Sequence, residues 1–225
     1  QEFHLNADTL TNNLTPLNDI GAIKKQLRIF RHQKLCEIIF LDICNHQPIE
    51  KTLVQLSDLA DLLIQQALIK AEQILIAKHG QPLNENNEAM TLNIIGMGKL
   101  GGKELNFSSD IDLICVFSEE GQLKGYGQLS HTQYFTHVVK LFKQLLNDAT
   151  EDSFVYRVDL RLRPWGDSGP IALSHNALEH YYQLHGREWE QYAMVKARVI
   201  TGNSDDIASL DAIIKPFVYR RYHDY

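Results

Sequence analysis

The pattern of apolar and polar positions divides the chain into helical outer parts and a mixed middle part. From Asp19 onward, apolar residues recur at near-helical spacing through "LRIFRHQKLCEIIFLDICNH", which predicts a long helix. Ser57 is a good N-cap residue, and two aspartates follow it at positions that suit a first helical turn. We therefore expect a second helix that begins at Ser57 and ends near Gly80.

The middle of the chain, from Thr91, has the pattern of short strands. "TLNIIGMG" predicts a strand that runs into a glycine turn, and "DIDLICVF" predicts a second strand. "SFVYRVDLRLRP" predicts a third strand that its final proline ends. "KLGGKELN" before the second strand predicts one or two helical turns.

Helical patterns surround these strands. "LSHTQYFTHVVKLFKQLLNDA" predicts an amphipathic helix between the second and third strands. After about Ser174 the pattern is helical again, and "REWEQYAMVKARVI" is expected to form one helix. The whole chain is therefore expected to have an α+β fold.

Three parts are expected along the 225 residues. Residues 1–88 would form an N-terminal helical segment, 89–173 a core with a small mixed sheet, and 174–225 a truncated C-terminal helical segment. The chain begins with Gln and stops at "RRYHDY", so we expect a fragment. Its length suffices for a sizeable core.

Composition excludes several classes of protein. The net charge of −6 and a pI near 5.9 argue against a general nucleic-acid binder. The three cysteines have no CxxC spacing, which disfavours a disulfide framework or zinc site and favours a reducing cytoplasm. No apolar run is long enough to span a membrane, and no signal peptide is recognisable, so no membrane partner is expected.

Candidate chemistry begins in "SSDIDLI", where Asp110 and Asp112 interrupt an apolar run. Side chains alternate along a strand, so both carboxylates point to one face, with Cα atoms about 6.6 Å apart. Carboxylates are costly to bury without a positive partner. The pair could therefore converge on one metal ion or bridge two.

The third predicted strand adds another carboxylate, Asp159, on a face that it shares with Arg157, Arg161 and Arg163. If this strand lies beside "DIDLI", three carboxylates about 5 Å apart would repel by about 3 kcal/mol per pair at a dielectric constant near 20. A divalent cation removes this repulsion. Oxygen ligands without His or Cys favour Mg²⁺ or Mn²⁺, and neighbouring arginines favour phosphoryl or nucleotidyl transfer.

Simpler interpretations remain open. Asp159 could be an ordinary ion-pair partner of Arg157 or Arg161, and Lys99 could be a solvated helix charge. "GMGKLGG" could bring backbone N–H groups to phosphate oxygens, although it is neither a P-loop nor a GxGxxG fingerprint. On a helix, Lys196 and Arg198 would point in different directions, so only one of them is expected to reach a phosphate.

The spacing of "GMGKLGGKELNFSSDIDLI" resembles the nucleotidyltransferase superfamily of the DNA polymerase β type. That signature is Gly-Ser, a short helix, Ser-Asp-x-Asp on the next strand and a third Asp on a later strand. Lys99 stands where the superfamily usually has serine, so the phosphate contact of that serine is not carried over. The resemblance implies a polymerase-β-like core with a small mixed sheet.

A narrower resemblance covers nearly the whole chain. "YRVDLRLRPWGDSGPIALS", "GREWEQYAMVKARVI" and "LSDLADLLIQQAL" look like the bifunctional glutamine synthetase adenylyltransferase/adenylyl-removing enzymes. That family has two related nucleotidyltransferase domains, and "ELNFSSDIDLI" resembles the N-terminal, adenylyl-removing copy.

This resemblance implies an enzyme that removes AMP from a tyrosine of glutamine synthetase by Mg²⁺-dependent phosphorolysis, using phosphate and releasing ADP. It implies glutamine synthetase and the PII signalling protein as partners. Asp110, Asp112 and Asp159 would be the catalytic and metal-binding residues. The expected nucleotide- and phosphate-binding residues are Gly98, Lys99, Gly101, Gly102, Ser109, Arg161, Arg163, Lys196 and Arg198.

Three alternatives stay open. The chain could be the adding copy, which makes the same bond from ATP, or another polymerase-β-like enzyme that acts on a small molecule. It could also be a PII-responsive docking module with a vestigial site, although the intact aspartates count against that interpretation.

Overall fold

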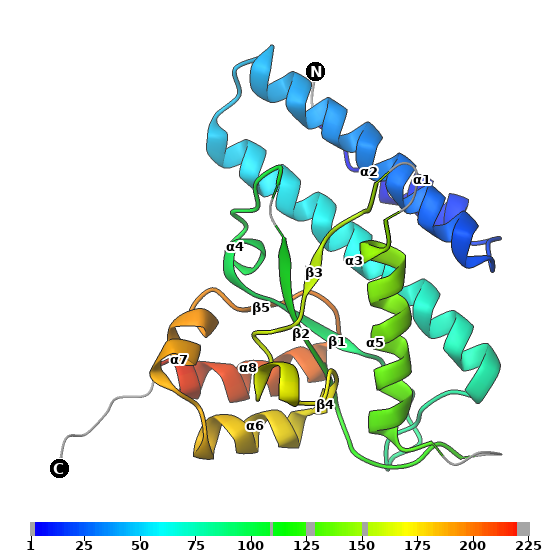
Figure 1. Ribbon diagram of the computed structural model, residues 1–225, viewed down its shortest axis with the longest axis vertical. Coiled ribbons are helices and arrows are strands. Elements are labelled where there is room, and N and C mark those ends of the chain that lie inside the picture. The colour runs from blue at the N-terminus through cyan, green and yellow to red at the C-terminus, as the bar shows by residue number, and fades with distance from the viewer. Residues whose placement is uncertain (1–2, 109, 125–128, 150–152, 220–225) are drawn as a thin grey trace.

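A small mixed sheet lies between groups of helices, as the computed structural model shows (Figure 1). The structure describes residues 3–108, 110–124, 129–149 and 153–219. Within these residues no helix is both long and apolar enough to cross a membrane. The expected α+β class is confirmed.

The elements, in chain order, are α1 (Ala7–Leu14), α2 (Ile20–Ile43), α3 (Ile49–His79), β1 (Asn93–Gly96), α4 (Gly98–Gly101), β2 (Ile111–Phe117), α5 (His131–Asn147), β3 (Val158–Asp159), the 3₁₀ turn η1 (Gly166–Ser168), β4 (Leu173–Ser174), α6 (His175–Leu184), α7 (Glu188–Met194), β5 (Arg198–Val199) and α8 (Ser204–Val218).

The sheet has the order β3-β2-β1-β5, and β4 also pairs with β2. Strand β1 runs antiparallel to both β2 and β5. Strand β2 pairs in parallel with β3 near its start and with β4 at its end. The β2–β3 register sets Asp112 opposite Asp159.

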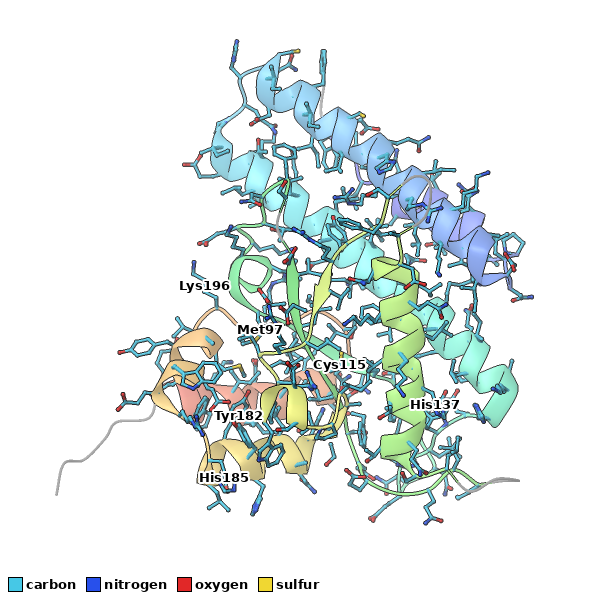
Figure 2. All side chains as sticks on the ribbon, viewed as in Figure 1. Met97, Cys115, His137, Tyr182, His185 and Lys196 are labelled. Carbon is cyan, nitrogen blue, oxygen red and sulfur yellow. The ribbon has the colours of Figure 1, made fainter. Side chains whose placement is uncertain are left out.

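Both faces of β2 are covered by helices, because its side chains alternate between two apolar clusters. Leu113 and Cys115 belong to the cluster that includes apolar side chains of α3 and α5. Ile114 and Val116 belong to the other cluster, which includes side chains of α6 and α8. Cys115 is labelled on the sheet in Figure 2. Burial on both faces leaves Asp112 as the only partly exposed residue of the strand.

Helix α3 begins at Ile49, so the expected start at Ser57 is wrong. Ser57 is fully buried within the helix, where its hydroxyl donates to the carbonyl of Leu53 (2.8 Å) and accepts from the backbone N–H of Leu105 (3.1 Å). A tertiary hydrogen bond therefore uses the hydroxyl that the sequence suggested as a cap. The predicted end at Gly80 is confirmed.

The third strand is shorter than expected. Only Val158 and Asp159 form a ladder, and the carboxylate of Asp159 then accepts the backbone N–H of Arg161 (2.7 Å). Such an Asx-type bond turns the chain away from the sheet. The alternation predicted as far as Pro164 consequently ends at Asp159.

Candidate active site

The pairing of β2 with β3 brings the predicted carboxylates together. Asp112 faces Asp159 across the two strands, and Asp110 directly precedes β2. Burial raises the pKa of the Asp112 carboxyl above its usual value, and the negative charges of Asp159 and Asp110 raise that pKa further. Asp112 therefore lies close enough to both of the other carboxylates for their charges to act on it.

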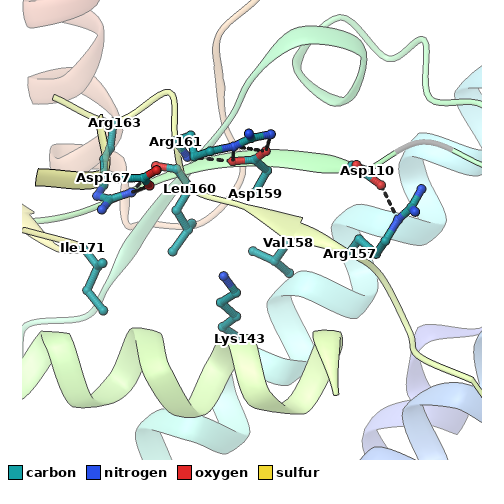
Figure 3. A pocket seen from close by; sticks show the side chains of 10 residues that line it. All are labelled: Asp110, Lys143, Arg157, Val158, Asp159, Leu160, Arg161, Arg163, Asp167 and Ile171. Atoms are coloured by element: carbon teal, nitrogen blue, oxygen red, sulfur yellow. Dashed lines mark hydrogen bonds and ion pairs between the residues drawn. The ribbon is translucent and has the colours of Figure 1, made fainter. Parts of the chain in front are cut away.

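Two of these carboxylates have arginine partners (Figure 3). Arg161 donates through Nε to Oδ2 of Asp159 at 2.8 Å, and Arg157 forms an ion pair with Asp110. Hydrogen bonding from Arg161 lowers the pKa of Asp159 below its usual value. Among the described residues, no ion pair or side-chain hydrogen bond holds the carboxylate of Asp112.

A pocket of about 360 Å³ opens beside these pairs. Lys143 of α5 reaches into it, as Figure 3 shows, and its positive charge contributes to the lowered pKa of Asp159. The ammonium group of Lys143 forms no ion pair or hydrogen bond with any residue that the structure describes. Sequence reasoning missed this lysine because helical periodicity locates it on α5 but cannot show which strand α5 covers. The pocket is lined by Asp110, Lys143, Arg157, Val158, Asp159, Leu160, Arg161, Arg163, Asp167 and Ile171.

The donor atoms available for a metal ion are all carboxylate oxygens, which suit Mg²⁺ or Mn²⁺. In their present rotamers, however, no three His, Cys, Asp or Glu side chains within the described ranges are arranged to hold an ion. Asp110 and Asp159 are directed at arginines instead. The donor set fits a hard divalent cation chemically, provided that these two ion pairs open.

Among the predicted glycines, Gly98 lies nearest to the carboxylates. Its φ of +54° suits glycine, and a Cβ atom there would lie 3.5 Å from Oδ2 of Asp112. Gly101 has another role, since a Cβ atom there would lie 2.0 Å from the carbonyl oxygen of Lys196. Gly102 lies against the side chain of Lys196, and Lys99 is exposed. Close packing with the chain before β5 accounts for Gly101 and Gly102. The predicted Ser109 lies outside the described residues.

Arg163 is placed differently from the other arginines of its segment. It is 7 % exposed and donates to the carbonyl oxygens of Leu160 (2.7 Å) and Pro170 (3.2 Å). These bonds fix the loop after β3. The shared strand face expected for Arg161 and Arg163 does not form, because the chain turns between them.

Lys196 and Arg198 do not lie on a helix, because α7 ends at Met194 and Arg198 begins β5. Lys196 forms an ion pair with Glu104. Arg198 binds Asp61 of α3 at 3.0 Å and the carbonyl oxygen of Gly101 at 3.2 Å. The single helix expected over these residues is therefore wrong, and both cations have protein partners.

Comparisons with known proteins identify the family. The family model described as glutamate-ammonia ligase adenylyltransferase matches residues 1–212. A bifunctional glutamine synthetase adenylyltransferase/adenylyl-removing enzyme of Alteromonas mediterranea is 50 % identical over 203 residues, covering 89 % of this chain and 20 % of the relative. Proteins of the same name from Idiomarina loihiensis and Thioalkalivibrio sulfidiphilus are 43 % and 41 % identical, covering 97 % and 92 % of this chain and 23 % and 21 % of the relatives.

The chain thus spans about a fifth of the length of the curated relatives that it matches. The matched region nevertheless includes the three aspartates, the pocket beside them and most of the helices on both sides. The chain belongs to the glutamate-ammonia ligase adenylyltransferase family.

Proposed function

We propose that this chain carries a nucleotidyltransferase site that removes AMP from an adenylylated tyrosine of glutamine synthetase. The reaction is phosphorolysis, in which inorganic phosphate takes up the AMP group and leaves as ADP. Glutamine synthetase is the proposed protein substrate, and PII is the proposed regulatory partner.

One observation carries this proposal, namely the juxtaposition of Asp112 on β2 with Asp159 on the adjacent strand β3 and with Asp110 directly before β2. The pocket beside them holds cations that suit phosphate, because a guanidinium presents paired N–H donors and an ammonium a point charge. The names of the relatives include both transfer and removal of the adenylyl group. The resemblance of the aspartate segment to the removing copy favours removal.

In the proposed reaction an oxygen of phosphate attacks the phosphorus of AMP, and a new P–O–P bond gives ADP. The bond between phosphorus and the tyrosine oxygen breaks, and the phenolate takes up the proton that the attacking hydrogen phosphate loses. Arg161 and Lys143 would hold the incoming phosphate and orient it for in-line attack. In the reverse direction Asp159 could accept the proton of the tyrosine hydroxyl.

Asp110, Asp112 and Asp159 would hold one or two Mg²⁺ ions. The chemistry that bound Mg²⁺ supplies is neutralisation of the charge that develops on the transferred phosphoryl group and the leaving phenolate. Mn²⁺ has similar ligand preferences and is the natural substitute in binding measurements.

The test is to mix the 225-residue chain with adenylylated glutamine synthetase and Mg²⁺, with and without phosphate, and to identify the released nucleotide. ADP that forms only with phosphate supports the proposal, and Asp112→Asn is expected to lower the rate by about 10³-fold, or about 4 kcal/mol of barrier. Asp205→Asn, an exposed change in the first turn of α8, is the matched control. An Asp112→Asn protein that folds and keeps most of its activity would contradict the metal assignment.

The alternative, addition of AMP from ATP, is decided by the same preparation. Incorporation of AMP into unmodified glutamine synthetase, without phosphate-dependent release, would mean that this site adds the group. Absence of both activities and of Mg²⁺-dependent nucleotide binding would favour a vestigial site in a docking module.

A further inference from the structure

Two arginine–aspartate ion pairs engage the side chains that the proposed reaction needs. The aspartates are needed for the cation, and the arginines are needed for phosphate. Asp159, whose side chain is 18 % exposed, is held by Arg161, and Asp110 is held by Arg157. A cation site requires these carboxylates to be free of arginine. A phosphate site requires the arginines to be free of carboxylate.

Both arginines are able to move. Their side chains are 59 % exposed for Arg157 and 73 % exposed for Arg161, and they flank the two-residue strand β3. The Arg157–Asp110 pair is exposed on both sides, and such pairs stabilise proteins by only about 0–1 kcal/mol, so it opens at little cost. The Arg161–Asp159 pair is bidentate and its carboxylate is mostly buried, so its opening depends on the ligands that replace it. Figure 3 shows both guanidiniums at the same pocket as the ammonium of Lys143.

The charges of the pocket make the two ligands depend on each other. Three carboxylates (Asp110, Asp112 and Asp159) lie at the pocket or directly beside it with three cations of its lining (Lys143, Arg157 and Arg161). The other charged lining residues, Arg163 and Asp167, face each other at 3.8 Å. A divalent cation that arrives alone meets carboxylates whose charge is already neutralised by the arginines. A phosphate that arrives alone must compete with aspartates for the same arginines.

We infer that Arg157 and Arg161 exchange partners, passing from Asp110 and Asp159 to phosphate when the carboxylates take up a divalent cation. Each ligand thereby removes the competitor of the other, and the two bind with positive cooperativity. Lys143 has no carboxylate partner to release within the described part of the chain, and it supplies the fixed positive charge of the anion site. The inference rests on the proposed function, since it assumes that the three aspartates hold the cation.

Linkage requires phosphate to raise the affinity for the cation by the same factor by which the cation raises the affinity for phosphate. The measurement is Mn²⁺ binding to the 225-residue chain, from the paramagnetic resonance signal of free Mn²⁺. Titrations are made in chloride and in inorganic phosphate at equal ionic strength, and a protein-free titration corrects for the solution complex of Mn²⁺ with phosphate. Phosphate is expected to lower the dissociation constant for Mn²⁺ by about fivefold or more.

The double variant Arg157→Ala/Arg161→Ala separates partner exchange from a simple change of charge. Without phosphate it is expected to bind Mn²⁺ about fivefold more tightly than the wild type, because the competing cations are gone. Phosphate is then expected to leave its affinity nearly unchanged. Lys51→Ala/Lys78→Ala removes two exposed positive charges of α3, neither of which lines the pocket, and is expected to keep the full phosphate effect.

Three results would overturn the inference. Equal Mn²⁺ affinity with and without phosphate in the wild type removes the cooperativity, and an undiminished phosphate effect in the double arginine variant removes the role of the arginines. After either of these two results, loss of Mn²⁺ binding in Asp112→Asn would show that the metal site of the proposed function stands. Only the exchange of partners would then be rejected. Absence of Mn²⁺ binding in every protein rejects the exchange together with the metal assignment.

Discussion

At the scale of single residues, Glu72 of α3 should make the stability of the protein depend on pH. Burial raises the pKa of Glu72 from its ordinary value of 4.5 to about 7, although its Oε1 accepts the backbone N–H of Leu92 at 2.7 Å. Between these two pKa values the folded state binds more protons than the unfolded state. The contribution of Glu72 to the free energy of unfolding therefore falls as pH rises from 4.5 to 7 and is constant above that range.

Glu72→Gln removes this titration and keeps a hydrogen-bond acceptor for Leu92. The difference in free energy of unfolding, variant minus wild type, is expected to rise by about 2 kcal/mol as the pH is raised from 5 to 8. Urea unfolding at both pH values measures the difference. Glu50→Gln, an exposed change on the same helix, should show almost none. Equal pH dependence in wild type and Glu72→Gln would mean that Glu72 is charged at neutral pH in the folded protein.

Single residues also differ in whether their place in the candidate site could be predicted from sequence. Asp110 and Asp112 could be found because two carboxylates in an apolar run that predicts a buried strand require an explanation. In the structure only Asp112 lies in the strand, and Asp110 precedes it at an exposed position. Lys143 could not, since its position over Asp159 depends on how α5 crosses the sheet. The strand pattern wrongly placed Arg163 on the same face as Asp159. The hydrogen bond from the backbone N–H of Arg161 to the Asp159 carboxylate turns the chain and ends the alternation of side chains before Arg163.

At the scale of elements, the segment from β1 to α4 depends on a close approach of two backbones. A Cβ atom at Gly101 would lie 2.0 Å from the carbonyl oxygen of Lys196 and 2.5 Å from that of Gly96. Neither oxygen belongs to a movable side chain. Gly101→Ala is therefore expected to lower the free energy of unfolding by about 3 kcal/mol, at the upper end of overpacking costs.

Gly80→Ala is the matched control for this close approach. No atom lies within 4 Å of a Cβ at Gly80, although its φ of +88° strains any other residue, so a loss of about 1 kcal/mol is expected. The φ of Gly101 is not positive, so a loss at Gly101 no larger than that at Gly80 would show that the chain around Lys196 moves to accept the Cβ atom and would contradict the predicted clash. Thermal or urea unfolding of both variants provides the comparison.

Elements with a clear periodicity of apolar residues could be predicted from sequence, whereas elements that depend on tertiary contacts could not. Helices α2 and α5 and strand β2 follow from the spacing of their apolar residues. Strand β5 does not, because Arg198 and Val199 pair with β1 only after α7 has ended at Met194. Helical periodicity over residues 187–200 gave no signal for that break.

At the scale of the whole molecule, Asp61 joins the N-terminal helices to the sheet. Its side chain is 13 % exposed and accepts from Arg198 of β5 (3.0 Å) and from Lys103 after α4 (2.6 Å). One apolar cluster also includes residues from α2 and α3 together with residues of β1 and β2. The helices before residue 89 and the sheet after it are consequently expected to unfold in one cooperative transition.

Asp61→Ala tests this coupling, because it leaves two partly buried cations without their shared carboxylate. A loss of about 2 kcal/mol is expected, against less than about 1 kcal/mol for Asp58→Ala, which pairs with the same lysine at a more exposed position. The fluorescence of Trp165 and Trp189 reports on the part of the chain after β3, whereas far-UV circular dichroism is dominated by the long helices α2 and α3. Both signals should shift together in Asp61→Ala. A fluorescence transition that stays at the wild-type position while the dichroism transition moves would show two separately folding units and would contradict the coupling through Asp61.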